Sequence, residues 1–173
     1  MTPVREVLLV TGGLGAGKTS VAVELGELLA ARGTSSSVID LDQLCWTTPD
    51  PASGIGVIDV LAASLRAVLP VHEEAGVHRF VLPRLLRDAA DVQAVADAVA
   101  PARVVVVLLT ADARERERRL LRRDSASTLE GHLDDVERLL PDPATADIAV
   151  ATDGRTVADV AAEVLTRWDA AGS

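Results

Sequence analysis

Lys18 is the only lysine in this chain of 173 residues, and the other sixteen basic residues are all arginine. It lies within the segment Gly12–Thr19, which matches the pattern G-x-x-x-x-G-K-[ST] at every fixed position. In that pattern backbone N–H groups surround phosphate oxygens, the lysine contacts the β and γ phosphates, and the hydroxyl binds Mg²⁺. A compact ammonium fits a narrow phosphate site better than a broad guanidinium does. The lone lysine therefore indicates a phosphate-binding loop.

The residues around this loop have the required order of strand, glycine-rich turn and helix. The apolar run Arg5–Val10 favours a strand buried on both faces, and apolar residues at helical spacing follow the loop over 21–31. The helix N-terminus adds partial positive charge to the anion site. The competing dinucleotide pattern G-x-G-x-x-G fails, because its third position is Lys18. We predict that ATP phosphates are bound by Gly13, Gly15, Ala16, Gly17, Lys18, Thr19 and Ser20.

Two aspartates end the next apolar run, at Asp40 and Asp42. On a strand, residues two apart point to the same side, so we expect both carboxylates to project together. Beside a phosphate site they would hold Mg²⁺ together with Thr19 and accept a proton from an attacking hydroxyl. The alternative is that Asp42 only caps a turn that begins at Gln43.

A dense run of arginines occupies the segment 114–123. Like charges at this density do not stabilise an isolated helix, but they suit closure over a polyphosphate. We expect a lid at about 114–135, in which Arg119 and Arg123 contact the phosphates. The alternative is a solvated charged face balanced by Glu115 and Glu117, which we expect for Arg114, Arg116 and Arg118; Arg122 is left open.

Helical and strand patterns alternate along the rest of the chain, which predicts an α/β fold with a parallel sheet covered on both faces. Pro70 is expected to end or kink the second long helix. The predicted strands are Glu6–Val10, Ser36–Leu41, Val77–Leu82, Arg103–Leu109 and Asp147–Ala151. The predicted helices cover 21–31, 58–69, 92–99, 113–123, about 128–140 and 157–168.

Composition limits the possible functions. A formal net charge of −9 argues against nucleic acid as a partner, although it permits a nucleotide substrate. The single cysteine, Cys45, fits a reducing compartment, and no apolar stretch is long enough to span a membrane. We expect one cytoplasmic domain over 1–173 that acts as a monomer or homodimer away from membranes.

With these motifs in place, the chain resembles the small P-loop kinases, the group that holds shikimate, gluconate, adenylyl-sulfate and nucleotide kinases and antibiotic phosphotransferases. The resemblance implies a three-layer α-β-α nucleotide-kinase fold with a five-stranded parallel sheet and a helical lid. In the shikimate-kinase branch an Asp-x-Asp follows the second strand; by that match Asp40 serves Mg²⁺ and Asp42 holds the acceptor and takes its proton. The run Arg119–Arg123 is similar to the recurrent lid arginines, and the loop at Arg155 corresponds to one that lies against adenine.

The resemblance does not extend to the acceptor. Leu82–Leu86 stands where shikimate kinases carry three glycines, and the gluconate and adenylyl-sulfate kinase signatures are missing. Trp46 would either cover a ring-shaped acceptor or anchor its loop to the core. Arg84 and Arg87 would either pair with an anionic group of the acceptor or form a salt bridge with Asp88 or Asp91. Arg155 would either stack on the base or belong to a plain turn capped by Thr156.

The function that these residues favour is an ATP-dependent phosphotransferase, which moves the γ-phosphoryl group of ATP to a hydroxyl of a small molecule with the help of Mg²⁺. In that interpretation Lys18, Asp42, Arg119 and Arg123 are catalytic, while Asp42, Trp46 and Arg84 bind the acceptor. The alternative is a nucleotide-binding ATPase or switch that acts through a partner. The acidic balance of the chain disfavours a polynucleotide kinase.

Overall fold

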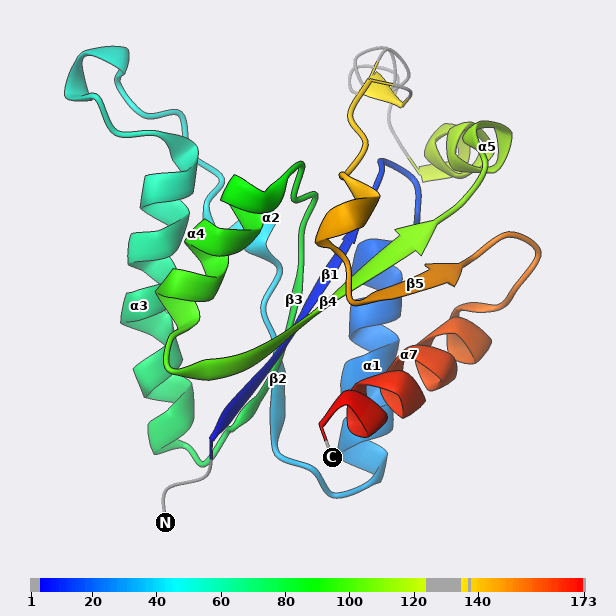
Figure 1. Cartoon of the computed structure of the whole chain (residues 1–173), viewed down its shortest axis with the longest axis horizontal. Helices are drawn as coiled ribbons and strands as arrows, with labels where there is room; N and C mark the ends of the chain where they lie inside the picture. The colour runs from blue at the N-terminus through cyan, green and yellow to red at the C-terminus, as the bar shows by residue number, and fades with distance from the viewer. Residues whose placement is uncertain (1–3, 124–134, 137, 173) are drawn as a thin grey trace.

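A five-stranded, all-parallel sheet forms the centre of the molecule, in the order β2-β3-β1-β4-β5 (Figure 1). We analysed a computed structural model, which describes residues 4–123, 135–136 and 138–172. The strands are β1 (Arg5–Gly12), β2 (Ser36–Val38), β3 (Arg79–Pro83), β4 (Ala102–Thr110) and β5 (Ile148–Ala151). Each predicted strand is present, and the predicted α/β class is confirmed.

Helices cover both faces of this sheet and give the molecule three layers (Figure 1). Helices α1 (Lys18–Ala31) and α7 (Val157–Ala171) lie on one face, whereas α3 (Val57–Glu74) and α4 (Ala89–Val99) lie on the other. The remaining elements are α2 (Leu41–Leu44), α5 (Ala113–Arg123) and two single 3₁₀ turns at Pro51–Ser53 and Pro143–Thr145. No helix in the described ranges is both long and apolar enough to cross a membrane.

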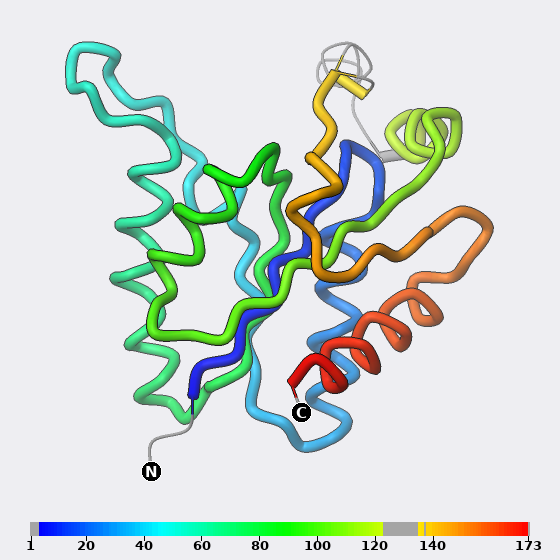
Figure 2. The backbone as a smooth tube through the Cα atoms, viewed as in Figure 1, coloured from blue at the N-terminus to red at the C-terminus, as the bar shows by residue number. Residues whose placement is uncertain are grey.

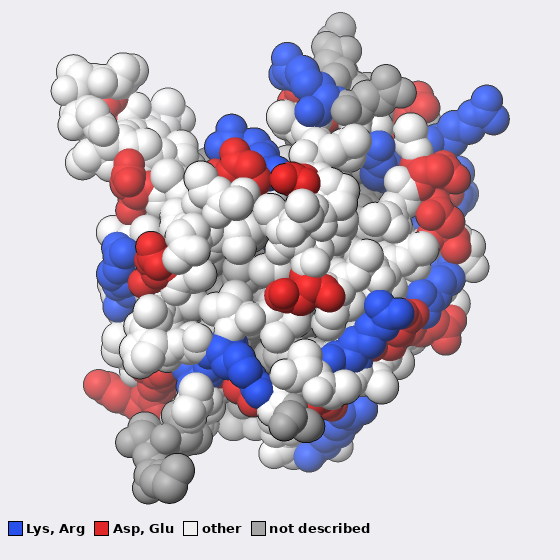
Figure 3. Space-filling view, viewed as in Figure 1, with Lys and Arg blue, Asp and Glu red and all other residues white. Residues whose placement is uncertain are grey.

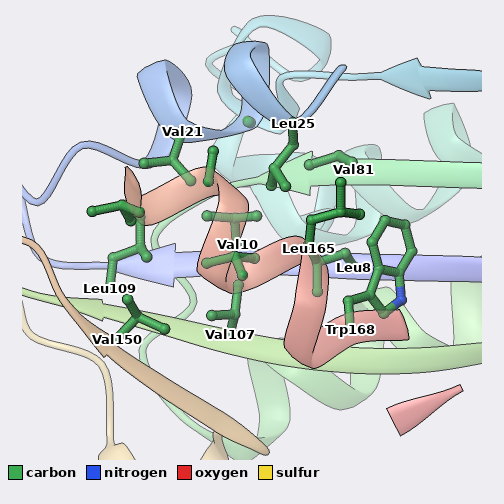
Figure 4. Packing of buried hydrophobic residues seen from close by; sticks show 14 of the residues in the cluster. Leu8, Val10, Val21, Leu25, Val81, Val107, Leu109, Val150, Leu165 and Trp168 are labelled. Atoms are coloured by element: carbon green, nitrogen blue, oxygen red, sulfur yellow. The ribbon is translucent and has the colours of Figure 1, made fainter. Parts of the chain in front are cut away.

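Strand β1 contributes to both core layers because its side chains alternate between the two faces. Leu8 and Val10 pack with α1 and α7, in a cluster that also holds the fully buried Trp168 (Figure 4). Val7 and Leu9 pack instead against the layer of α3 and α4. Burial on both faces explains why β1 is a continuous apolar run, and the phosphate-binding loop follows directly from this central strand.

The carboxyl ends of the central strands meet at one edge. In the parallel register Val10 lies beside Pro83 of β3, and Gly12 lies beside Leu109 of β4. In open α/β sheets ligands bind at this edge. Two parts of the chain project beyond it on opposite sides, the segment 46–56 between α2 and α3, and helix α5 (Figure 2).

The opposite edge is closed by ion pairs. Arg79 contacts Glu6 at 3.0 Å and Asp169 at 2.8 Å, and its guanidinium lies 4.0 Å from the centre of the Trp168 ring. Glu6 also pairs with Arg103 at 2.6 Å, and Asp169 also pairs with Arg32 at 3.0 Å. These contacts join β1, β3, β4, α1 and α7 at the amino ends of the strands.

Two predicted boundaries are wrong. The second strand stops at Val38 rather than Leu41, because Asp40 caps α2 and turns the chain out of the sheet. Helix α3 continues through Pro70 to Glu74, so the expectation that Pro70 ends the helix is wrong, whereas a kink at Pro70 stays a prediction. Contacts with residues outside the helix stabilise its last turn. His72 Nδ1 lies 2.9 Å from Ser37 Oγ, and Glu73 pairs with Arg5 at 2.7 Å.

The helix predicted over about 128–140 lies largely outside the described residues, as does the second half of the predicted lid. The helix predicted over 113–123 is present as α5, and its role as the first half of a lid stays a prediction. The helix predicted at the C-terminal end is present as α7, and its Trp168 is fully buried.

Candidate active site

The phosphate-binding loop joins β1 to α1 and has a backbone that side chains would not tolerate. Gly15 and Gly17 have φ values of 77° and 97°, in the left-handed region that favours glycine. A Cβ on Gly15 would lie 2.5 Å from the carbonyl oxygen of Arg116. The loop is therefore packed tightly against α5, and Gly15 is required for both its conformation and its space.

Lys18 is the first residue of α1, and its side chain folds back over the loop. Its Nζ donates to the carbonyl oxygens of Gly12 at 3.0 Å and Gly13 at 3.1 Å. The backbone N–H groups of the first turn of a helix carry partial positive charge, and Lys18 lies in that turn of α1. The loop thus combines an ammonium group with a helix N-terminus, which is the arrangement needed to bind phosphate.

Thr19 and Asp40 supply two oxygen atoms beside the loop. Thr19 Oγ1 donates to Asp40 Oδ2 at 3.1 Å, while Asp40 Oδ1 accepts from the amides of Asp42 and Gln43. The N-terminus of α2 therefore orients the Asp40 carboxylate toward the hydroxyl. Among the described residues no cluster of three or more His, Cys, Asp or Glu could bind a metal. A pair of hard oxygen donors fits Mg²⁺, which completes its shell with water and phosphate oxygens.

Asp40 and Asp42 line one cavity of about 600 Å³ together with the phosphate-binding loop. The two carboxylates were predicted to project together from the end of a strand, but the structure brings them together in another way. Neither lies on a strand; Asp40 is the N-cap of α2, and Asp42 is in its first turn. The alternative that Asp42 is the cap is therefore wrong, because Asp40 has that role. The described lining of this cavity comprises Leu14, Gly15, Gly17, Lys18, Thr19, Ser20, Asp40, Asp42, Gln43 and Trp46.

Arg84 lies behind the acidic side of the cavity. It follows β3, and one guanidinium nitrogen, Nη1, contacts Asp42 Oδ1 at 2.9 Å, the Leu41 carbonyl at 3.2 Å and Cys45 Sγ at 2.9 Å. The expected alternatives for Arg84, an acceptor anion or a pair with Asp88 or Asp91, did not include this partner. The pairing with Asp91 is made by Arg87, with two contacts of 2.9 and 3.1 Å.

Trp46 stands at the rim of the cavity with 83% of its surface exposed. The alternative that it anchors its loop to the core is therefore wrong. Its neighbour Cys45 takes that role, since this side chain is buried and donates to the carbonyl of Leu41 at 2.9 Å.

A second cavity, of about 220 Å³, lies on the other side of the loop. Arg119 lines this cavity and donates several hydrogen bonds to the surrounding chain. Its Nη1 donates to the carbonyls of Gly15 and Ala16 at 3.3 and 3.4 Å and to Thr152 Oγ1 at 2.9 Å, and its Nη2 donates to the Thr152 carbonyl at 2.9 Å. Arg119 therefore joins α5, the phosphate-binding loop and the end of β5. The side chain of Arg123 lies outside what the structure describes.

Thr152 is a site residue that the sequence did not reveal. It is 4% exposed, and its Oγ1 contacts the carbonyls of Thr110 at 3.2 Å and Ala16 at 3.4 Å. The only signal in the sequence is its position, as the first polar residue after the apolar run of β5 at the carboxyl edge.

Arg155 also borders the second cavity. It pairs with Glu163 at 2.7 Å and donates to the carbonyls of Ala151 and Asp159. The capping alternative is present as well, because Thr156 Oγ1 accepts from the Asp159 amide at the start of α7. Stacking of Arg155 on a base remains a prediction.

Arg116 corrects the expectation of a solvated face. It is 5% exposed, and its guanidinium donates to the carbonyls of Ala111 and Val136. Its backbone packs on Gly15. The signal for this was available, since Arg116 lies four residues before the buried Leu120 and so shares its helix face. Arg114 and Arg118 are exposed as expected.

Glu115 organises the outer side of α5. Hydrogen bonds from Arg118 and then Arg119 lower the pKa of its carboxyl to about 2. The distance from Arg119 Nε to Glu115 Oε1 is 2.8 Å. Glu115 therefore keeps its charge over the physiological range and holds the Arg119 guanidinium toward the phosphate-binding loop.

Solved structures of kinases share this fold. The APS kinase of Mycobacterium tuberculosis, solved in complex with AMPPNP and APS, gives a TM-score of 0.70 at 20% identity, over 96% of this chain and 99% of that one. A gluconokinase from Sinorhizobium meliloti gives 0.62 at 22% identity, over 95% and 92%. A sugar kinase from a Janibacter species gives 0.61 at 19% identity, over 96% and 95%.

At these identities the similarity establishes the three-layer fold of the P-loop kinases, as the sequence predicted. No protein-family profile matches the sequence, and no curated protein is significantly similar to it. The acceptor must therefore be inferred from the residues of this chain.

Proposed function

We propose that this protein is an ATP-dependent kinase that transfers the γ-phosphoryl group of ATP to a hydroxyl of a small molecule. One observation carries the proposal. Lys18 and Thr19 of the phosphate-binding loop line the same 600 Å³ cavity as Asp42. A phosphate site and a carboxylate that share one cavity suit a reaction in which an acceptor meets a phosphoryl group. A switch or simple ATPase has no need of such an acceptor site.

The nucleotide phosphates would occupy the loop, with the base in the cavity bounded by Arg119, Thr152 and Arg155. Lys18 would neutralise the β and γ oxygens. Thr19 and Asp40 would hold Mg²⁺, which neutralises charge on the transferring group. Arg119, already bonded to the loop, would keep it shaped for the phosphates, and Arg123 would contact them from the lid.

Asp42 would act on the acceptor. The acceptor oxygen bonds to the γ-phosphorus as the bond from that phosphorus to the bridging oxygen of ADP breaks, and the hydroxyl proton passes to the Asp42 carboxylate. Arg84 bonds to Oδ1, so we assign Oδ2 to the acceptor proton. The role of Arg84 is then to orient Asp42. Net negative charge supports a small-molecule acceptor rather than nucleic acid.

The test is consumption of ATP by the purified chain with Mg²⁺, first alone and then with a panel of nucleosides, sugars, sugar acids and antibiotics. The proposal expects ADP formation that depends on an acceptor and yields an acceptor heavier by one phosphoryl group. ADP formation at the same rate with every acceptor and with none would favour the ATPase or switch.

A further inference from the structure

The side of the large cavity away from the phosphate-binding loop is formed by three residues, Asp42, Gln43 and Trp46, which we call the acceptor wall. Asp42 is 60% exposed and Trp46 is 83% exposed, so both can meet a molecule from solution. Asp40 adds a second carboxylate at the junction with the loop. The wall thus offers carboxylate, amide and indole groups.

The basic side chains on this side of the cavity already form hydrogen bonds or ion pairs within the protein. Of the described residues that line the cavity, Lys18 is the single basic one, and it bonds to the loop carbonyls. Arg84 gives its contact to Asp42 and to the carbonyl of Leu41, and Arg87 is paired with Asp91. The sequence of the segment 124–134 contains no lysine or arginine.

A carboxylate, phosphate or sulfate group on the acceptor would therefore face Asp40, Asp42 and the polyphosphate of ATP, and among the described lining residues it would find no cation other than Lys18. Juxtaposed like charges strongly disfavour a wrong partner. An uncharged polyol meets no such penalty, and an amine is attracted by the two carboxylates.

Trp46 adds a planar surface at the rim. The face of an indole binds apolar faces and attracts cations more strongly than other aromatic rings do. The surrounding segment 46–56 carries only one charged residue, Asp50, and appears almost entirely white in the space-filling view (Figure 3). The rim is therefore suited to an uncharged or positively charged molecule.

We propose that the acceptor bears no anionic group, and that it lays an uncharged or amine-bearing face on Trp46 while its hydroxyl approaches Asp42. This inference rests on the proposed kinase activity and narrows the class of its substrate.

The experiment compares matched pairs of acceptors that differ in charge, with kcat/KM measured at fixed ATP and Mg²⁺. The probes are glucitol with gluconate, adenosine with AMP, glucosamine with glucuronate, and shikimate methyl ester with shikimate. We expect the uncharged or amine-bearing member to be preferred by roughly tenfold or more in each pair that is used. Preference for the anionic member overturns the inference while leaving the kinase proposal intact. ATP hydrolysis without phosphorylation of any probe overturns the kinase proposal, and the inference with it.

Variants then test the wall itself. Trp46→Ala should raise the KM of the preferred acceptor about tenfold, leaving the KM of ATP unchanged, and Trp46→Phe should restore most of the loss. Ile55→Ala is the control, since this apolar side chain is also exposed but does not line the cavity. Equal effects from Trp46→Ala and Ile55→Ala would overturn the role of the indole.

Gln43→Arg provides the reverse test because it places a cation on the wall. It should raise the relative kcat/KM of the anionic member of each pair. An unchanged ratio would show that charge on this wall does not select the acceptor and would overturn the inference.

Discussion

The two sides of the phosphate-binding loop are built in different ways. On the nucleotide side, the buried Thr152 and the half-buried Arg119 connect α5, the loop and β5 through hydrogen bonds between distant parts of the chain. On the acceptor side, the segment 46–56 is held by local bonds, such as those from the Ala52 amide and Ser53 Oγ to Asp50. The nucleotide side is thus formed by contacts between distant elements. On the acceptor side Asp42 is also held by a distant residue, Arg84, but the segment 46–56 beside it can change without disturbing those contacts.

The largest effect on turnover should come from replacing Lys18, which belongs to the phosphate-binding loop between the two sides. Lys18→Met should abolish transfer, because it removes the charge and retains the length. Lys18→Arg should reduce turnover roughly a hundredfold, comparable to the loss of a charge-stabilising donor. The measurement is acceptor-dependent turnover, with circular dichroism and thermal unfolding as checks on folding. Near-normal turnover of Lys18→Arg would contradict the argument from the lone lysine.

Asp42→Asn should lower turnover by about a hundredfold with little change in ATP affinity, since it removes a base on the acceptor side only. Asp40→Asn should instead raise the Mg²⁺ concentration needed for half-maximal rate. Titrations of ATP and Mg²⁺ for both variants separate the two roles. Equal and mild effects would mean that both side chains serve the local structure of α2 alone.

Arg119→Ala should act mainly on the nucleotide side. We expect ATP affinity to fall on the order of tenfold, because hydrogen bonds to the loop and to Thr152 are lost together. The melting temperature should fall as well. Arg114→Ala is the matched control on an exposed position of the same helix and should change neither quantity. If the two variants behave alike, α5 acts through its total charge rather than through Arg119.

The smallest effect is a pH dependence of stability confined to the nucleotide side. The pKa of Glu115 is lowered from 4.5 to about 2 by Arg118 and Arg119. Because the folded state has the lower pKa, this carboxylate stabilises the fold fully above about pH 4.5 and loses the contribution as pH falls toward 2. The difference in melting temperature between the natural protein and Glu115→Gln should therefore be constant near neutral pH, shrink as pH falls below about 4.5 and vanish below pH 2. A difference that stays constant down to pH 2 would contradict the assigned cause.

The parts that could be predicted from the sequence are those specified by local patterns. The loop Gly12–Thr19 was evident because its glycines and lysine have fixed spacing, and the strands were evident because burial on both faces leaves long apolar runs. The pairing of Arg84 with Asp42 could not be predicted from the sequence, because it depends on how the end of β3 packs against α2.

Burial of Thr152 was equally inaccessible, because a threonine is common at a surface and only the packing of α5 and β5 against the loop encloses it. Burial of Arg116 differs, because its spacing of four residues from Leu120 indicates the buried face of the helix, although the dense run of arginines favoured a solvated one. The end of β2 was missed for another reason. Apolar residues on both sides of Asp40 favour a longer strand, whereas Asp40 as a helix cap favours a turn, and the two signals fall on the same few positions.

The register of β1 has a consequence for how this protein is synthesised. The residues that contact β1 and the loop after it are far away in sequence. Glu6 of β1 lies beside Arg79 and Arg103, and Ala16 of the loop contacts Thr152. As the chain leaves the ribosome, the glycine-rich loop emerges early, yet the walls that shape it appear only when β4 and β5 have followed. Domains fold as units, and pairings between distant segments form slowly. A nascent chain therefore lacks the walls of the proposed nucleotide site until most of it has been made. Under the proposed function, ATP would bind and stabilise the completed fold rather than the growing chain.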